Sequence, residues 1–332
     1  MFELESGVAA VTPADPVWCG QHIVWKEPTT WRPILKGWLA ARARPDGLQR
    51  MAALGEQDLC WDDSDWLDLL AEELTTSVEA VQAELANAFD GVTLRTYHGC
   101  RVPDAGVFYR EGLKINDPEA LAEQARRIVA GSDDLAWMRP SLEQMIAEFD
   151  DRNRDEGRLY LCADDRPQLD DIGHYLLYGS EWIQCLLGWG AHRALRQYGA
   201  PTMVEVDLPF RWATWATREA FARHLLQEWT RLTVNEPSWS PALDFSIVLH
   251  IDVPATCIVG HYHPSELKDP FHGKTRRLSS NVRCPACEHQ PRHDLGLNPC
   301  NYCLISDNID SARNPLPRNR RVPKPRRKPA CG

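Results

Sequence analysis

The sequence lacks any apolar run long enough to cross a membrane, and it lacks the basic start of a signal peptide. No uninterrupted hydrophobic stretch approaches the roughly 18 residues that a spanning helix needs. The first residues, MFELESGVAAVTPADP, carry acidic side chains where a signal peptide carries basic ones. We therefore expect a cytoplasmic protein with no membrane association.

Several common catalytic motifs are also missing. Neither GxGxxG nor a P-loop pattern occurs, which argues against a Rossmann enzyme and a P-loop NTPase. GxSxG and HExxH are absent as well, so a hydrolase nucleophile elbow and a zincin helix are not predicted. The 332 residues, 43% hydrophobic and 25% charged, have the composition of a folded protein with one large or two ordinary domains.

Hydrophobic periodicity predicts an α+β protein. The segment after Thr76 fits a capping box with Glu79 and a helix that stops at Gly91. Short strands are scattered among helices without a βαβ alternation. The predicted helices cover 76–90, 119–130, 141–150, 170–195 and 217–232. The predicted strands cover 92–98, 158–163, 203–209 and 245–264, the last broken at Pro254.

The ends of the chain differ from its middle. Residues 1–75 have helical patterns and are rich in tryptophan, namely Trp18, Trp25, Trp31, Trp38, Trp61 and Trp66. Residues 311–332 carry eight basic side chains and no acidic one, although the whole chain has a net charge of −10. A basic tail on an acidic body is typical of a nucleic-acid contact, an intramolecular tether or a solvated extension.

The strongest local motif is CPACEHQPRHDLGLNPCNYC, two CxxC pairs with twelve residues between them. Two such turns can direct four thiolates at one Zn²⁺ in a closed, structural site. The predicted ligands are Cys284, Cys287, Cys300 and Cys303. We expect a zinc ribbon over 271–310, which either binds nucleic acid or caps the body.

Histidines near the two CxxC pairs offer alternatives. His289 and His293 could each replace a cysteine ligand. His261 and His263 in GHYHP share one face of a strand, but no third ligand is in view in the sequence, so we expect a structural or surface role for them.

A strand ends in Tyr97-His98-Gly99-Cys100, and a helix that stops before Gly112-Leu113 follows it. A later strand carries Tyr160, and the next helix carries Tyr175, with Tyr178 as the alternative. This order resembles the diphtheria-toxin-like ADP-ribosyltransferases, whose fold poly(ADP-ribose) polymerases share. The resemblance covers roughly 91–265 and implies a split β-sheet core within a domain over 76–270.

The resemblance implies that NAD is the substrate and that Tyr97, His98 and Gly99 bind it. His98 would hydrogen-bond a ribose hydroxyl, and the backbone of Gly99 would pair with the carboxamide of the nicotinamide. The rings of Tyr160 and Tyr175 would enclose the nicotinamide, a geometry suited to aromatic faces. A carboxylate would stabilise positive charge that develops on the ribose.

The carboxylate is where the sequence departs from the family pattern. The late strand over 245–264 lacks the family's glutamate, and Cys100 replaces the family's threonine. Glu181 is the preferred candidate, with Asp244 as its rival. At helical pitch Glu181 lies about 120° around from Tyr175, which argues against one shared site. Glu205 alternates with valines, and its position suits a solvent-facing strand residue.

We therefore predict an enzyme that transfers ADP-ribose to a protein or nucleic-acid acceptor, in a toxin or defence role. One alternative is a non-catalytic zinc-ribbon protein that binds nucleic acid through its tail. A second alternative is an RNA 2′-phosphotransferase, which shares the fold. That activity needs several basic residues in the pocket, and Arg95 and Arg101 are too few to favour it.

Overall fold

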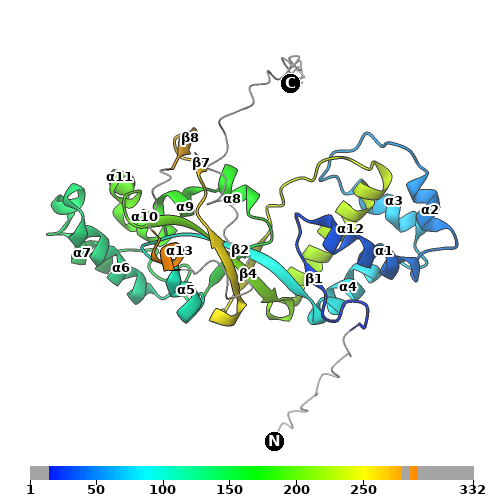
Figure 1. The fold of residues 1–332 in the computed structure, drawn as a ribbon, viewed down its shortest axis with the longest axis horizontal. Helices are drawn as coiled ribbons and strands as arrows, with labels where there is room; N and C mark the ends of the chain where they lie inside the picture. The colour runs from blue at the N-terminus through cyan, green and yellow to red at the C-terminus, as the bar shows by residue number, and fades with distance from the viewer. Residues whose placement is uncertain (1–14, 279–283, 290–332) are drawn as a thin grey trace, which may run out of the picture.

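The structure is a computed structural model that describes residues 15–278 and 284–289. The described chain combines helices with a mainly antiparallel sheet, so the expected α+β class is correct. Figure 1 shows β2 and β4 crossing the middle of the molecule, with helices gathered at both ends. No helix in the described ranges is both long and apolar enough to cross a membrane.

Six strands form the main sheet, in the order β5-β3-β2-β4-β6, with β1 paired to β2. A separate hairpin pairs β7 with β8. The strands are β1 (His22–Ile23), β2 (Thr93–Val102), β3 (Leu159–Cys162), β4 (Ala200–Pro209), β5 (Ser246–Leu249), β6 (Ile258–Tyr262), β7 (Glu266–Asp269) and β8 (Lys274–Arg277). The segment 245–264 therefore forms two strands, on either side of Pro254.

The central strand β2 is paired unequally on its two edges. It pairs with β4 along its whole length, from Thr93 opposite Pro209 to Val102 opposite Ala200. It pairs with β3 only where Tyr97 lies opposite Cys162. The second half of β2 therefore has no ladder partner on the β3 side among the described residues, and the sheet opens there.

One end of the molecule is a helical lobe. Its helices are α1 (Arg32–Ala40), α2 (Gly47–Ala52), α3 (Asp65–Glu73), α4 (Val78–Ala88) and α12 (Trp215–Val234). The long helix α12 contacts α2, α3 and α4 (Figure 1). The core of this lobe holds Trp18, Trp31, Trp38 and Trp66 with at most 2% exposure, and it continues into the sheet through Leu94 and Val206. No break in this core coincides with residue 75.

The other end carries shorter helices around a second core. They are α5 (Gly106–Glu111), α6 (Pro118–Gly131), α7 (Leu142–Ala147), α8 (Arg166–Asp170), α9 (His174–Tyr178), α10 (Glu181–Leu187) and α11 (His192–Leu195). A further short helix, α13 (Pro285–His289), follows the β7–β8 hairpin in the sequence. The second core includes Ala125 and Ile128 of α6, Leu177 of α9 and Met203 of β4.

Two local predictions are wrong for identifiable reasons. The N-cap of α4 is Ser77, whose hydroxyl accepts from the backbone N–H of Ala80 at 3.2 Å, and not Thr76. The predicted helix over 170–195 is divided into α9, α10 and α11. Gly179 has φ of 80° and Gly188 has φ of 68°, and neither value is compatible with a continuing right-handed helix.

Candidate functional site

A cavity of about 730 Å³ lies where β2 and β3 separate. This volume is in the usual range for sites that bind small molecules. Its walls come from the second half of β2, from β3, from α5, and from the segment that contains α9 and α10. Five of the residues expected from the sequence line it, namely His98, Gly99, Tyr160, Tyr175 and Glu181.

His98 is held in one orientation at the opening of the sheet. Its Nδ1 lies 3.0 Å from the backbone oxygen of Tyr160. A carbonyl only accepts, so Nδ1 carries the proton and Nε2 keeps a lone pair. Burial lowers the pKa of His98, although the bond to the Tyr160 carbonyl opposes that effect. The ring is therefore neutral at pH 7 and offers an acceptor to a ligand hydroxyl.

Gly99 and Gln168 lie against each other in the wall of the cavity. A Cβ added to Gly99 would come within 2 Å of Oε1 of Gln168, so only glycine fits without a rearrangement. Gln168 is 5% exposed, and its Nε2 donates to the sulfur of Cys162 at 2.9 Å. Its Oε1 has no hydrogen-bond partner among the residues that the structure describes. A buried acceptor without a partner is unfavourable and is suited to an incoming N–H donor.

Tyr175 and Glu181 form a direct hydrogen bond in the cavity wall. The hydroxyl of Tyr175 donates to Oε2 of Glu181 at 2.9 Å, and Nη2 of Arg154 donates to Oε1 at 3.0 Å. Burial, reinforced by the charge of Glu181, raises the pKa of Tyr175, so the hydroxyl keeps its proton. A continuous helix would have placed Glu181 about 120° around from Tyr175. The helix ends at Gly179, where the chain turns, so the two side chains meet.

Tyr160 lies at the rim of the same cavity. It is 38% exposed, and its hydroxyl donates to Oδ1 of Asp155 at 2.9 Å. Asp244, the rival carboxylate, lines the cavity just before β5 and is exposed. Both candidate carboxylates therefore border the same cavity.

Three residues weighed in the sequence lie away from the cavity. Tyr97 points into the second core and is 1% exposed, because alternate residues of β2 face opposite sides of the sheet. Tyr178 is buried, and its hydroxyl donates to Asp269 at 2.7 Å. Glu205 lies opposite Tyr97 on β4 and does not line the cavity.

The cationic side chains near His98 already have partners. Arg101 donates to four backbone carbonyls, those of Leu176, Arg196, Tyr198 and Gly199. Arg95 pairs with Asp207 at 2.7 Å. Neither guanidinium is available to a phosphate without loss of these bonds.

Sequence reasoning missed several lining residues. Gln168, Arg154 and Phe108 line the cavity. They lie in segments that join or follow the motif-bearing elements, and no residue pattern marks them. Only the fold brings them to the cavity.

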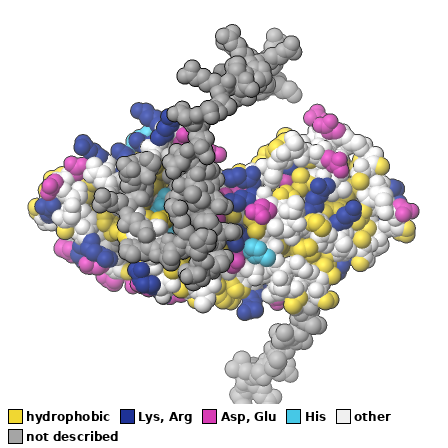
Figure 2. Space-filling model, in the orientation of Figure 1, with side chains coloured by type: hydrophobic (Ala, Val, Ile, Leu, Met, Phe, Trp, Pro, Cys, Tyr) yellow, Lys and Arg dark blue, Asp and Glu magenta, His cyan; other side chains and the backbone are white. Residues whose placement is uncertain are grey.

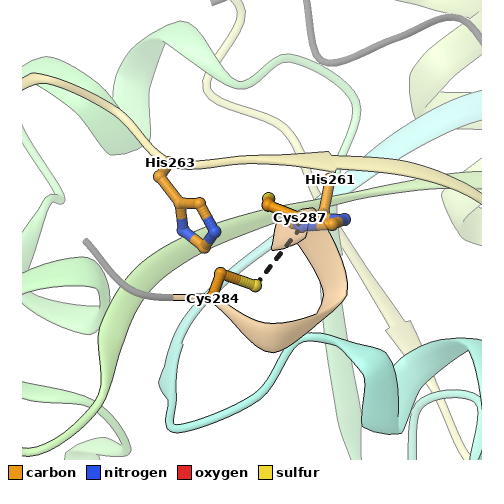
Figure 3. Close-up of side chains that lie close together, drawn as sticks. All are labelled: His261, His263, Cys284 and Cys287. Atoms are coloured by element: carbon orange, nitrogen blue, oxygen red, sulfur yellow. Dashed lines mark hydrogen bonds between the residues drawn. The ribbon is translucent and has the colours of Figure 1, made fainter. Parts of the chain in front are cut away.

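A second cluster lies at the end of β6. One ligand-type atom from each of His261, His263, Cys284 and Cys287 lies within 4.8 Å of the others. Figure 3 shows His261 of β6 and His263, just after that strand, facing the two cysteines, which belong to the turn that opens α13. The other proposed ligands, Cys300 and Cys303, and the alternative His293 lie outside the described residues, and the side chain of His289 is not described.

No family model, curated protein or solved structure matches this chain. The likeness to ADP-ribosyltransferases therefore depends on the order of short motifs along the sequence.

Proposed function

We propose that the chain is an ADP-ribosyltransferase that cleaves NAD⁺ between nicotinamide and ribose. The observation that carries this proposal is the meeting of His98, Gly99, Tyr160, Tyr175 and Glu181 around one cavity. These residues come from three separate segments, and the order of motifs along the sequence predicts all five as site residues. Their convergence supports a shared ligand because unrelated structural residues have no reason to meet there.

The lining groups match the parts of the nicotinamide riboside. The lone pair on Nε2 of His98 accepts from a ribose hydroxyl. The unpartnered Oε1 of Gln168, next to Gly99, accepts from the carboxamide NH₂ of the nicotinamide. The rings of Tyr160 and Tyr175 supply aromatic faces to the pyridinium, which favours contact with their π-systems.

The proposed reaction breaks the bond between C1′ of the ribose and N1 of the nicotinamide. The bonding electrons leave with N1, so nicotinamide departs neutral and C1′ becomes electron-poor. Glu181, fixed by Tyr175 and Arg154, places a negative charge beside the ribose and stabilises this state. The acceptor atom then forms the new bond to C1′ and loses its proton to Glu181 or water.

The acceptor is a protein or a nucleic acid, and a toxin or defence role remains the proposal that the resemblance supports.

The alternative function, non-catalytic binding of nucleic acid, depends on residues 311–332, which lie outside the described residues. Figure 2 shows basic and acidic side chains interspersed on the part of the visible face that the described residues form. The phosphotransferase reading is less favoured because Arg95 and Arg101 are already engaged.

The proposal is tested by replacing His98 and by replacing a matched histidine. His98→Ala removes the acceptor for the ribose hydroxyl, and we expect nicotinamide release from NAD⁺ to fall at least about 100-fold. His250→Ala is the control, because His250 also contacts a backbone carbonyl, that of Gly157 at 3.2 Å, but does not line the cavity.

The two variants are compared by chromatographic measurement of nicotinamide, with circular dichroism to confirm folding. The expected pattern is a large loss for His98→Ala and full activity for His250→Ala. Equal nicotinamide release by wild type and His98→Ala would show that His98 has no role in the reaction.

A further inference from the structure

We propose that His261, His263, Cys284 and Cys287 together hold a structural Zn²⁺ ion. This ligand set differs from the four-cysteine ribbon expected from the sequence, because two histidines of β6 and the loop after it take the places of Cys300 and Cys303. The site would join the first CxxC turn, that of Cys284 and Cys287, to the central sheet (Figure 3).

The spacing of the ligand atoms suits a tetrahedral metal. Nε2 of His261 lies 3.3 Å from the sulfur of Cys287 and 3.8 Å from that of Cys284. Zinc bond lengths imply ligand-to-ligand distances of about 3.3–3.8 Å around a tetrahedron. Two of the ligand-to-ligand distances are therefore already those of a tetrahedral zinc site, and the others are at most 4.8 Å.

His263 has a buried nitrogen with no partner. Its Nδ1 lies 2.7 Å from the backbone oxygen of Pro201, which can only accept, so Nδ1 carries the proton. Its Nε2 therefore has a lone pair, and that atom is buried without a well-aligned hydrogen bond among the described residues, although the side chain interacts with that of Cys284. A histidine held at one nitrogen by a carbonyl, with the other nitrogen free to coordinate, is the usual arrangement of a metal ligand.

His261 is oriented in the same way. It is 5% exposed, and its Nδ1 lies 2.8 Å from the hydroxyl of Tyr109. Donation from Nδ1–H to that oxygen leaves Nε2 as the coordinating atom, and Nε2 is the nitrogen that faces the two sulfurs. The supporting bond comes from α5, a different element from the ligands.

The two cysteines lie in a turn suited to bind metal. The backbone N–H of Cys287 donates to the oxygen of Cys284 at 3.0 Å, which brings both side chains to one side. Cys284 is 2% exposed, and the backbone N–H of Ala105 donates to it. Cys284 also belongs to the first hydrophobic core, so the turn is packed against the body.

Zinc is the metal that this chemistry favours. Two thiolates and two imidazoles around a tetrahedral centre suit Zn²⁺ and leave no position for water. The ion would therefore stabilise the fold and would not activate a substrate. Through Tyr109 it would also fix α5, whose Val107 and Phe108 line the cavity.

The decisive experiment measures metal binding in two full-length variants. The first is Cys300→Ser/Cys303→Ser, which retains the proposed ligands. The second adds His263→Ala to the first. Both are titrated with Co²⁺, whose thiolate charge-transfer and tetrahedral absorption bands report a two-sulfur site, and zinc content is measured by mass spectrometry.

We expect one tightly bound metal per chain in the first variant and at least a 100-fold weaker affinity in the second. Loss of the metal from Cys300→Ser/Cys303→Ser would overturn the assignment in favour of the four-cysteine set. Undiminished binding after addition of His263→Ala would equally overturn it. His250→Ala, placed in the same background, is the histidine control and should keep the metal.

A second measurement protects against a variant that fails to fold. Chelation of the metal from the Cys300→Ser/Cys303→Ser protein should lower its melting temperature by several degrees, and added Zn²⁺ should restore it, because a ligand bound only to the folded state stabilises that state. A melting temperature unaffected by both treatments would contradict a structural metal.

Discussion

The proposed cleavage of NAD⁺ depends on the carboxylate of Glu181. Glu181→Gln keeps the size of the side chain and removes its charge. We expect nicotinamide release to fall by about 100- to 1,000-fold, the usual effect of removing one charge-stabilising group, with little change in NAD⁺ affinity. Steady-state kinetics would separate the loss in kcat from any change in KM.

Asp244→Asn is the matched comparison, because Asp244 also lines the cavity but is exposed. We expect less than a tenfold change from this substitution. A large loss of nicotinamide release in Asp244→Asn, together with nearly normal release in Glu181→Gln, would show that Asp244 is the carboxylate that stabilises the charge on the ribose.

At the residue scale, the sequence predicted some of the residues that line the cavity, whereas Tyr97, also predicted, lies in the second core. His98, Gly99 and the two tyrosines were found because they follow a motif order. Gln168 was not found, because its role depends on contact with Gly99, which lies about 70 residues earlier. The sequence also did not predict that Cys284 and Cys287 lie beside His261 and His263, because both cysteines come more than 20 residues later.

Among the elements, the break between α9 and α10 determines the shape of the site. Gly179 has φ of 80° and ψ of −151°, a conformation almost restricted to glycine. Gly179→Ala should therefore lower the free energy of unfolding by about 1–3 kcal/mol. It should also reduce activity, because the turn brings Tyr175 to Glu181.

The control for this substitution is Gly131→Ala at the end of α6. An added Cβ at Gly131 meets no atom within 4 Å, and its backbone is not in the left-handed region. We expect unchanged or slightly higher stability in urea unfolding. Equal stability of Gly179→Ala and wild type would show that the turn does not require glycine.

Element types could be predicted from periodicity, but breaks and pairings could not. The helix over 119–130 and the strand over 203–209 correspond to α6 and β4 within a few residues. The segment 170–195 keeps a helical pattern across Gly179 and Gly188, so apolar periodicity alone did not reveal the division at these glycines. The opening between β2 and β3 depends on long-range pairing, which local sequence does not encode.

Across the whole molecule, the tryptophan-rich region and the sheet share one core. Trp31 is fully buried and stacks on Trp25, with ring centroids 6.0 Å apart, and Trp25 packs edge-on against Phe221 of α12 at 6.1 Å. The boundary expected at residue 75 therefore does not separate two hydrophobic cores. The sequence suggested a boundary at residue 75 because the tryptophan content changes there. The packing of side chains continues across that position.

This shared core predicts cooperative unfolding. Trp31→Ala should destabilise the whole protein by about 3–5 kcal/mol, because it removes a large buried ring. Trp61→Ala, at a position 41% exposed, is the control and should change stability by less than about 1 kcal/mol. Tryptophan fluorescence should report one transition for the tryptophan-rich region and the sheet, and a circular dichroism transition of the sheet that persists after the buried tryptophans are exposed would contradict the shared core.

The most direct test of the central claim is release of nicotinamide from NAD⁺ by the purified full-length protein. The account predicts that nicotinamide appears, in the presence of cell extract as a source of acceptor, and that His98→Ala abolishes the release. Absence of release from the folded, zinc-bound wild type, with or without extract, would contradict an NAD⁺-cleaving function for this cavity.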